Sequence, residues 1–323
     1  MEKNHELKRY NIKPIRKLNN EEIEYIAETA TRKMETMIPE FSGANMYEKL
    51  KNANIYLADI SEKYTKVNYI VSTNSIYIRG EENIKKIDEI MFHEIFHYIQ
   101  CVKDNQGEGM PERMGLCRFK EYRIKGLALN EAAIQLIISM LFENEQESNN
   151  YFGIQIKSIH NKYFPILCAL LQQIVYIVGD IPLVTSLLDN SDDFEIVFEE
   201  LAGEKAYGFL MSAFDKMMQA RDKIVENNRI INEQFMQDNK KKLLEKQNKI
   251  YVQEIQNHFS AIQKLCYTEY FNKIFKQVKN KEDLSEAKKE IERYYQHIGI
   301  INEKDDFMIY IQKKLNKLNK KIK

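Results

Sequence analysis

The chain has 323 residues, of which 44% are hydrophobic, and its 48 basic and 48 acidic residues give a formal net charge of zero. This composition is typical of a soluble globular protein, and the length allows two domains. No apolar stretch approaches the roughly 20 residues that a membrane-spanning helix needs, which argues against an integral membrane protein. Residues 1–20 are polar and lack the apolar core of a signal peptide, so we expect a cytoplasmic protein. The four cysteines form no Cys-x-x-Cys pair, which predicts free thiols and argues against a thiolate metal site.

The first third of the chain predicts two helices followed by a small sheet. Residues 21–37 carry apolar side chains at three- and four-residue steps, and Pro39 ends this helix. Residues 46–53 are consistent with a second, shorter helix. Residues 54–60 and 67–79 alternate Ile, Tyr, Val and Thr with polar residues, a pattern typical of strands. We therefore expect a small β-sheet at about residues 54–80.

The next predicted helix carries the sequence His-Glu-x-x-His, at residues 93–97. Neither Pro nor Gly interrupts Glu81 to Lys103, and apolar residues recur there with helical spacing. On a helix, His93 and His97 lie one turn apart on the same face, so both imidazoles can reach one ion. Two neutral imidazoles suit Zn²⁺, and a catalytic zinc site needs a third protein ligand and leaves one position for water. Glu94 lies about 100° round the helix from His93, within reach of such a water.

Glu131 is the candidate for the third ligand. A loop rich in Gly separates the first helix from a second helical pattern that begins near Gly126 and runs to Phe142. The apolar residues of this second helix lie nearly all round it, which predicts that it is buried. An unpaired carboxylate in such a setting is costly, and a cation beside it removes that cost. The metal helices are therefore expected at about residues 82–142.

This combination resembles the gluzincin group of zinc metallopeptidases, whose pattern is His-Glu-x-x-His followed by a glutamate on a later helix. The resemblance covers about residues 54–140 and is specific at His93, Glu94, His97 and Glu131. It implies an α+β, predominantly α-helical fold with a zincin-like catalytic core, a small N-terminal sheet and one Zn²⁺ per chain. It also implies that Glu94 is the general base. The metzincin pattern is excluded, because it requires Gly and His at positions that Gln100 and Lys103 occupy here.

The resemblance also implies how a substrate would bind and which residue would orient a histidine ligand. The strand nearest the cleft, here 75–79, would bind an extended peptide substrate as an added antiparallel strand. In thermolysin-like members an Asp four residues after the ligand Glu orients a histidine, and this chain has Gln135 there. An amide oxygen accepts a hydrogen bond from an imidazole N–H more weakly than a carboxylate does. Gln135 is thus a candidate for this role.

Catalysis would require a second group, besides zinc, that stabilises the developing oxyanion. Three residues are candidates for it: Tyr122, His160 and Tyr163. Tyr122 lies nine residues before Glu131, the spacing that a thermolysin-like tyrosine has from its ligand Glu. For each of the three taken alone, a structural role or exposure at the surface is favoured over a catalytic role.

The rest of the chain predicts helices. Residues 144–150 form a polar turn, residues 163–178 an apolar helix, and residues 183–188, 194–201 and 207–218 shorter helices, so 150–215 is a helical lobe. Residues 1–215 hold 24 basic and 33 acidic residues, a net −9, whereas residues 216–323 hold 24 and 15, a net +9. We therefore divide the chain into a metallopeptidase domain, 1–215, and a Lys-rich helical extension, 216–323, with helix breaks near 280–284 and 299–306.

The sequence leaves three functions open. A zinc metallopeptidase that hydrolyses peptide bonds accounts for His93, Glu94, His97 and Glu131 together. The alternative is a zinc-containing but non-catalytic protein that binds an acidic protein partner through its basic helices, although these helices also fit a simple solvated surface. A nucleic-acid-binding role is disfavoured, because the chain has no helix-turn-helix, zinc-finger or RNA-binding signature.

Overall fold

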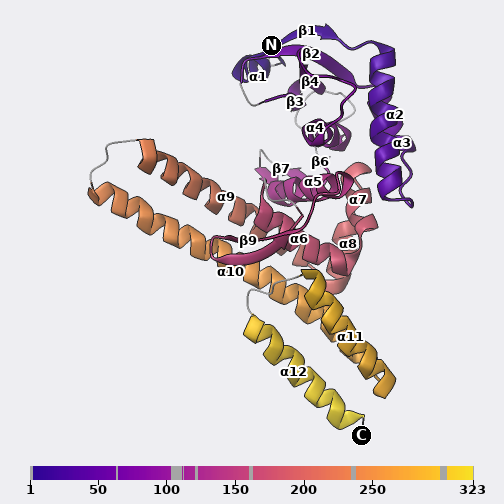
Figure 1. Ribbon diagram of the computed structural model, residues 1–323, viewed down its shortest axis with the longest axis vertical. Helices are drawn as coiled ribbons and strands as arrows, with labels where there is room; N and C mark the ends of the chain where they lie inside the picture. The colour runs from indigo at the N-terminus through magenta and orange to yellow at the C-terminus, as the bar shows by residue number, and fades with distance from the viewer. Residues whose placement is uncertain are drawn as a thin grey trace. The chain divides into compact units, whose positions relative to one another are not determined.

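The computed structural model describes residues 3–62, 65–102, 111, 113–120, 123–159, 163–233, 238–298 and 304–322 (Figure 1). The chain folds into two compact units: residues 1–144 with 180–194, and residues 145–179 with 195–323. The expected class, α+β and predominantly helical, is confirmed. All of the predicted metal ligands belong to the first unit.

A four-stranded sheet forms one layer of the first unit. Its strands are β1 (Ile12–Lys17), β2 (Asn54–Ile60), β3 (Val67–Ile70) and β4 (Ser75–Arg79), in the order β1-β2-β4-β3. Strands β2 and β4 pair in parallel, and the other two pairs are antiparallel. The sheet predicted at 54–80 is confirmed. The sequence pattern does not predict β1, because only the first residue of this strand is buried and Pro14 interrupts it.

Residues 75–79 form an interior strand, whereas the expected binding of a peptide as an added strand would require an edge strand. Ile76 of β4 pairs with Ile55 of β2 on one side and with Tyr69 of β3 on the other, so no free backbone edge remains for an added peptide. The edge on this side of the sheet is β3. The first four residues of β4 are all buried, as expected of an interior strand.

Helices cover this sheet and complete the first unit. They are α1 (Lys3–Arg9), α2 (Asn20–Met37), α3 (Ala44–Lys51), the short 3₁₀ turn η1 (Val71–Thr73), α4 (Glu89–Gln100), α5 (Leu127–Leu141) and α7 (Asp180–Leu188). The predicted helices at 21–37 and 46–53 are confirmed with small shifts. Helix α4 begins later than predicted, because the Asp88 side chain accepts a hydrogen bond from the Met91 N–H and so caps the helix there.

A second, smaller sheet lies between the two metal helices in the sequence. It consists of β5 (Cys101–Val102), β6 (Arg113–Met114), β7 (Cys117–Lys120) and β8 (Arg123–Lys125), paired in chain order and antiparallel. The sequence predicted a loop at 103–115 and no defined structure after it. These strands are two to four residues long, too short to show an alternating pattern.

The second unit is a hairpin of strands followed by long helices. Its elements are β9 (Glu147–Tyr151), β10 (Ile154–Ser158), α6 (Pro165–Val178), most of α8 (Asp193–Ala202), α9 (Ala206–Glu233), α10 (Asp238–Gln277), α11 (Lys281–Ile298) and α12 (Lys304–Lys321). Figure 1 shows α9 and α10 side by side as an antiparallel pair. Residues 147–150 of the polar turn predicted at 144–150 belong instead to strand β9. The turn follows it at Phe152 and Gly153, whose φ angles of 53° and 78° suit a tight hairpin.

The boundary between the two units does not coincide with the division expected at residue 215. Helix α6 packs against α10 and α11, and Gln263 of α10 donates a buried hydrogen bond to Gln173 of α6. Residues 145–179 therefore group with the C-terminal helices. Helix α7 packs against α4 and α5 and so belongs to the first unit. The helix breaks expected near 280–284 and 299–306 correspond to the ends of α10 at Gln277 and of α11 at Ile298.

The part of the chain that the structure describes contains no single helix long and apolar enough to cross a membrane. Only the consecutive helices α6 and α7, interrupted at Gly179, reach that length and composition when they are taken together.

Candidate metal centre

Helix α4 presents its two histidines toward α5 because the apolar side chains on its other faces pack in the core. Phe92, Ile95, Phe96 and Ile99 are each at most 1% exposed. Helix α4 packs against strand β3 and against α5. The histidines occupy the remaining stripe, one helical turn apart, as the spacing predicted.

Helix α5 is held against α4 by a buried amide bridge one residue before Glu131. Asn130 donates to Gln100 at the end of α4 (3.1 Å) and accepts a hydrogen bond from the Leu116 N–H (3.0 Å), and both amide side chains are fully buried. Gly115 lies against this bridge at φ 57°, and a Cβ there would come within 2.4 Å of the Asn130 oxygen. The bridge therefore fixes the rotation of α5 and turns Glu131 toward α4.

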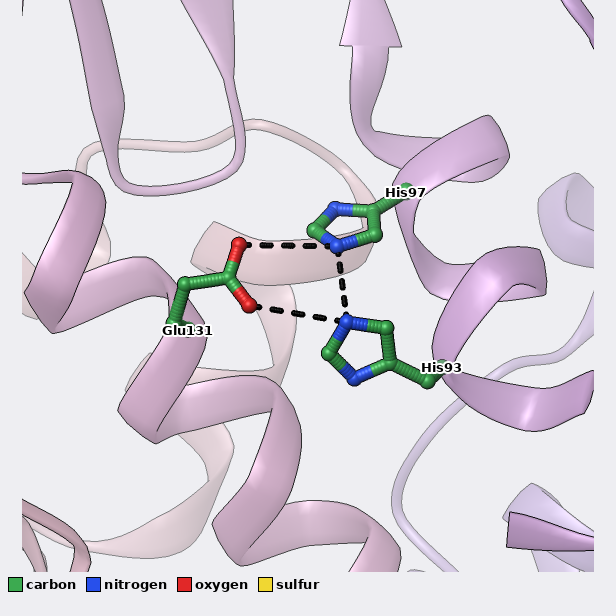
Figure 2. Close-up of side chains that lie close together, drawn as sticks. All are labelled: His93, His97 and Glu131. Carbon is green, nitrogen blue, oxygen red and sulfur yellow. Dashed lines mark hydrogen bonds and ion pairs between the residues drawn. The ribbon is translucent and has the colours of Figure 1, made fainter. Parts of the chain in front are cut away.

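His93, His97 and Glu131 converge, as Figure 2 shows, so the expectation that these three side chains meet is confirmed. The Nε2 atoms of the two histidines are 2.9 Å apart, and each lies 3.5 Å from one oxygen of Glu131. An ion about 2.0–2.1 Å from three ligands in a tetrahedron would separate them by about 3.3 Å. The three residues therefore form a group positioned to bind a metal ion. Their side chains keep 13–18% of their surface exposed, so an ion and a further ligand can reach them.

The electrostatics of the site favour a cation. Burial raises the pKa of Glu131, which the nearby His93 opposes. Burial likewise raises the pKa of Glu94 to about 8. The hydrogen bond from the Tyr69 N–H opposes this shift, and the charge of Glu131 adds to it. Burial lowers the pKa of His97 to about 4, which keeps this imidazole neutral and able to coordinate. A positive ion at this site would stabilise the ionised form of both carboxylates, and the neutral His97 imidazole is in the form that coordinates a metal.

Gln135, one turn after Glu131 on α5, lies behind His93. Its side-chain Nε2 is 2.7 Å from Nδ1 of His93, on the opposite side of the ring from the ligand atom. An amide can present either its NH₂ or its oxygen to a neighbour. If the Gln135 amide turns its oxygen toward the ring, that oxygen accepts a hydrogen bond from the Nδ1–H of His93. Nε2 is then unprotonated and free to coordinate. The described residues give His97 no such partner, since its buried Nδ1 has no hydrogen bond among them.

Glu94 takes no part in the convergent group and faces the sheet instead. One oxygen of its carboxylate, Oε2, accepts a hydrogen bond of 2.7 Å from the backbone N–H of Tyr69 in β3. Sequence analysis missed Tyr69, because a backbone donor leaves no signature in the residue type. Only the resemblance, which implies that the strand at 75–79 lies nearest the cleft, pointed to this sheet.

Of the three candidates for oxyanion stabilisation, Tyr163 is the one that lies among the described residues. Tyr122 and His160 lie outside the described residues. Tyr163 belongs to the second unit, whereas every residue of the metal group belongs to the first, and its side chain is 53% exposed.

Comparison with known proteins adds no relative to this description. No protein-family model matches the chain, and neither a curated protein nor a solved structure matches it. The interpretation of the site therefore depends on the chemistry and geometry of its residues.

Proposed function

We propose that this chain is a zinc-dependent metallopeptidase in which His93, His97 and Glu131 hold the ion. The observation that supports this proposal most is the approach of three ligand atoms from two helices to within 4.8 Å of one another. Two imidazoles and one carboxylate form a donor set typical of catalytic zinc in hydrolases. With three protein ligands, a tetrahedral ion keeps one position for water or substrate. When bound, Zn²⁺ supplies Lewis acidity that polarises a carbonyl and makes water a better nucleophile.

In this proposal the residues of the site bind the ion, orient a ligand histidine and transfer a proton. His93 and His97 stay neutral and coordinate through Nε2, and Gln135 fixes the orientation of the His93 ring. Glu94 takes a proton from the attacking water and passes it to the nitrogen of the leaving amine as the peptide C–N bond breaks. Its location beside His93 and its contact with β3 set its carboxylate apart from the three ligands. One water is consumed, and a carboxylic acid and an amine are formed.

The decisive experiment compares cleavage products of a proteome-derived peptide library incubated with the zinc-loaded full-length protein. Wild type is compared with Glu94→Gln, and Glu89→Gln on the same helix is the matched control. We expect one zinc per chain in all three proteins. New peptide termini should appear with wild type and Glu89→Gln but fall by at least about 100-fold with Glu94→Gln.

Two outcomes would contradict this function. Cleavage by Glu94→Gln at the wild-type rate would remove Glu94 as the base. Zinc binding without any cleavage by wild type would favour a non-catalytic metal protein.

A further inference from the structure

The Glu94 carboxylate is attached to the sheet by a backbone group. The Tyr69 N–H donates to Oε2 at 2.7 Å. The contact joins the helix that bears the metal ligands to the edge strand of the four-stranded sheet.

Strand geometry explains why this N–H is available. In an antiparallel pair, successive residues direct their backbone groups alternately toward the partner strand and away from it. The Lys66 carbonyl accepts a hydrogen bond from the Arg79 N–H across the β3–β4 pair, so Lys66 faces β4. Tyr69, three residues later, therefore directs its N–H away from β4, on the side where α4 packs.

The side chain of Tyr69 holds this part of β3 in place. Its ring packs edge-on against Tyr98 of α4, with ring centres 6.0 Å apart. Its hydroxyl donates to Asn74 at 2.9 Å, and the residue is only 7% exposed. The backbone donor at Tyr69 is thus fixed relative to α4 independently of its contact with Glu94.

We propose that the backbone N–H of Tyr69 positions Glu94 for catalysis: it holds Oε2 on β3 and leaves Oε1 to receive the proton of the attacking water. This inference depends on the proposed peptidase function. A backbone donor suits the task because it loses no side-chain freedom when it binds and allows the carboxylate a single orientation. Tyr69 acts through Glu94 and is a positioning residue.

The main test compares Tyr69→Pro with Tyr69→Val in the full-length, zinc-loaded protein. Both variants lose the ring, and valine is a good strand residue close to proline in size, but only proline removes the N–H. Proline is tolerated on an edge strand where the N–H faces away from the partner. The substrate is the peptide from the library that wild type cleaves fastest. We expect Tyr69→Pro to show a kcat about 10- to 100-fold below that of Tyr69→Val, with KM and zinc affinity unchanged.

Val67 provides the control for proline itself. Its N–H also points away from β4, two residues from Tyr69 on the same strand. Val67→Pro should therefore leave kcat within about threefold of Val67→Ala. An equal loss of kcat in Val67→Pro and Tyr69→Pro would overturn the inference, as would equal or higher kcat in Tyr69→Pro than in Tyr69→Val.

Amide hydrogen exchange tests the contact without any catalysis. The Tyr69 amide should exchange slowly in wild type and in Glu94→Gln, whose amide oxygen still accepts a hydrogen bond, but at least about tenfold faster in Glu94→Ala. Exchange that is the same in all three proteins would overturn the inference even if proline lowers kcat. The two proposals fail differently: full activity of Glu94→Gln removes the peptidase function, whereas exchange independent of Glu94 removes only the role of Tyr69.

Discussion

Gln135 approaches His93 from the side of the ring opposite to the ligand atom, with its amide nitrogen 2.7 Å from Nδ1. Both residues are positioned by helices that the Asn130–Gln100 bridge holds together. Such a partner favours metal binding by a histidine, because the group at Nδ1 decides which ring nitrogen keeps the proton and which one coordinates. The contact thus makes Gln135 a supporting residue of the proposed metal centre, although it would not touch the ion.

Replacing Gln135 by Met should weaken zinc binding by about 10- to 100-fold. Methionine has a similar volume but offers the Nδ1 proton no strong acceptor, so the ring loses its preferred tautomer and orientation. Gln135→Glu restores an acceptor and should bind zinc at least as tightly as wild type. Competition with a chelating dye measures both affinities. Gln173→Met, the same change in the second unit, is the control, and an equal zinc affinity in Gln135→Met and wild type would contradict this role.

The sequence carried enough information to predict the metal group, because helical geometry is regular. The spacing of His93 and His97 places both rings on one face of any helix, and a lone carboxylate in the apolar pattern around Glu131 needs a cation nearby. The strands at 54–60 and 67–79 also follow from alternation that is local in the sequence. Predicting these features does not require knowing which residues far apart in the sequence lie in contact.

Other features depend on pairing between distant segments, which a local pattern does not reveal. The composition of residues 75–79 fits an edge strand as well as an interior one. Only the pairing with β2 and β3 shows that β4 is interior. The link between Tyr69 and Glu94 depends on the direction of one backbone N–H. Strand β9 reads Glu-Ser-Asn-Asn-Tyr, a composition typical of turns, and it becomes a strand because β10 pairs with it.

Asn130→Ala should lower the free energy of unfolding of the first unit by about 1–3 kcal/mol. The substitution leaves the buried Gln100 side chain and the Leu116 N–H without their partner, and an unsatisfied buried polar group costs about that much. Urea unfolding followed by hydrogen exchange of α4 and α5 amides measures the change. The exposed Asn52→Ala is the control and should change stability by less than about 0.5 kcal/mol. A loss at Asn130 no larger than the loss at Asn52 would show that the bridge does not hold the helices together.

The N-terminus of α2 should lose stability in acid through Glu22. Its carboxylate forms two hydrogen bonds of 2.7 Å with Arg16 and accepts one from the Asn19 N–H, and these contacts lower its pKa from 4.5 to about 2. Because the folded form binds this proton more weakly than the unfolded chain, the contribution is complete above pH 4.5 and is lost as the pH falls toward 2. The difference in urea midpoint between wild type and Glu22→Gln should therefore shrink across that range. A difference that stays constant from pH 6 to pH 2 would mean that these contacts do not stabilise the ionised form.

Zinc stoichiometry and affinity of the purified full-length protein test the central claim most directly. Inductively coupled plasma mass spectrometry, after dialysis against a weak chelator, should find about one zinc per chain in wild type. The Glu131→Ala and His93→Ala variants should retain the fold and lose most of the metal, because each removes one of three protein ligands. Wild-type protein that is folded and does not take up added zinc, or Glu131→Ala that binds zinc as tightly as wild type, would contradict the account.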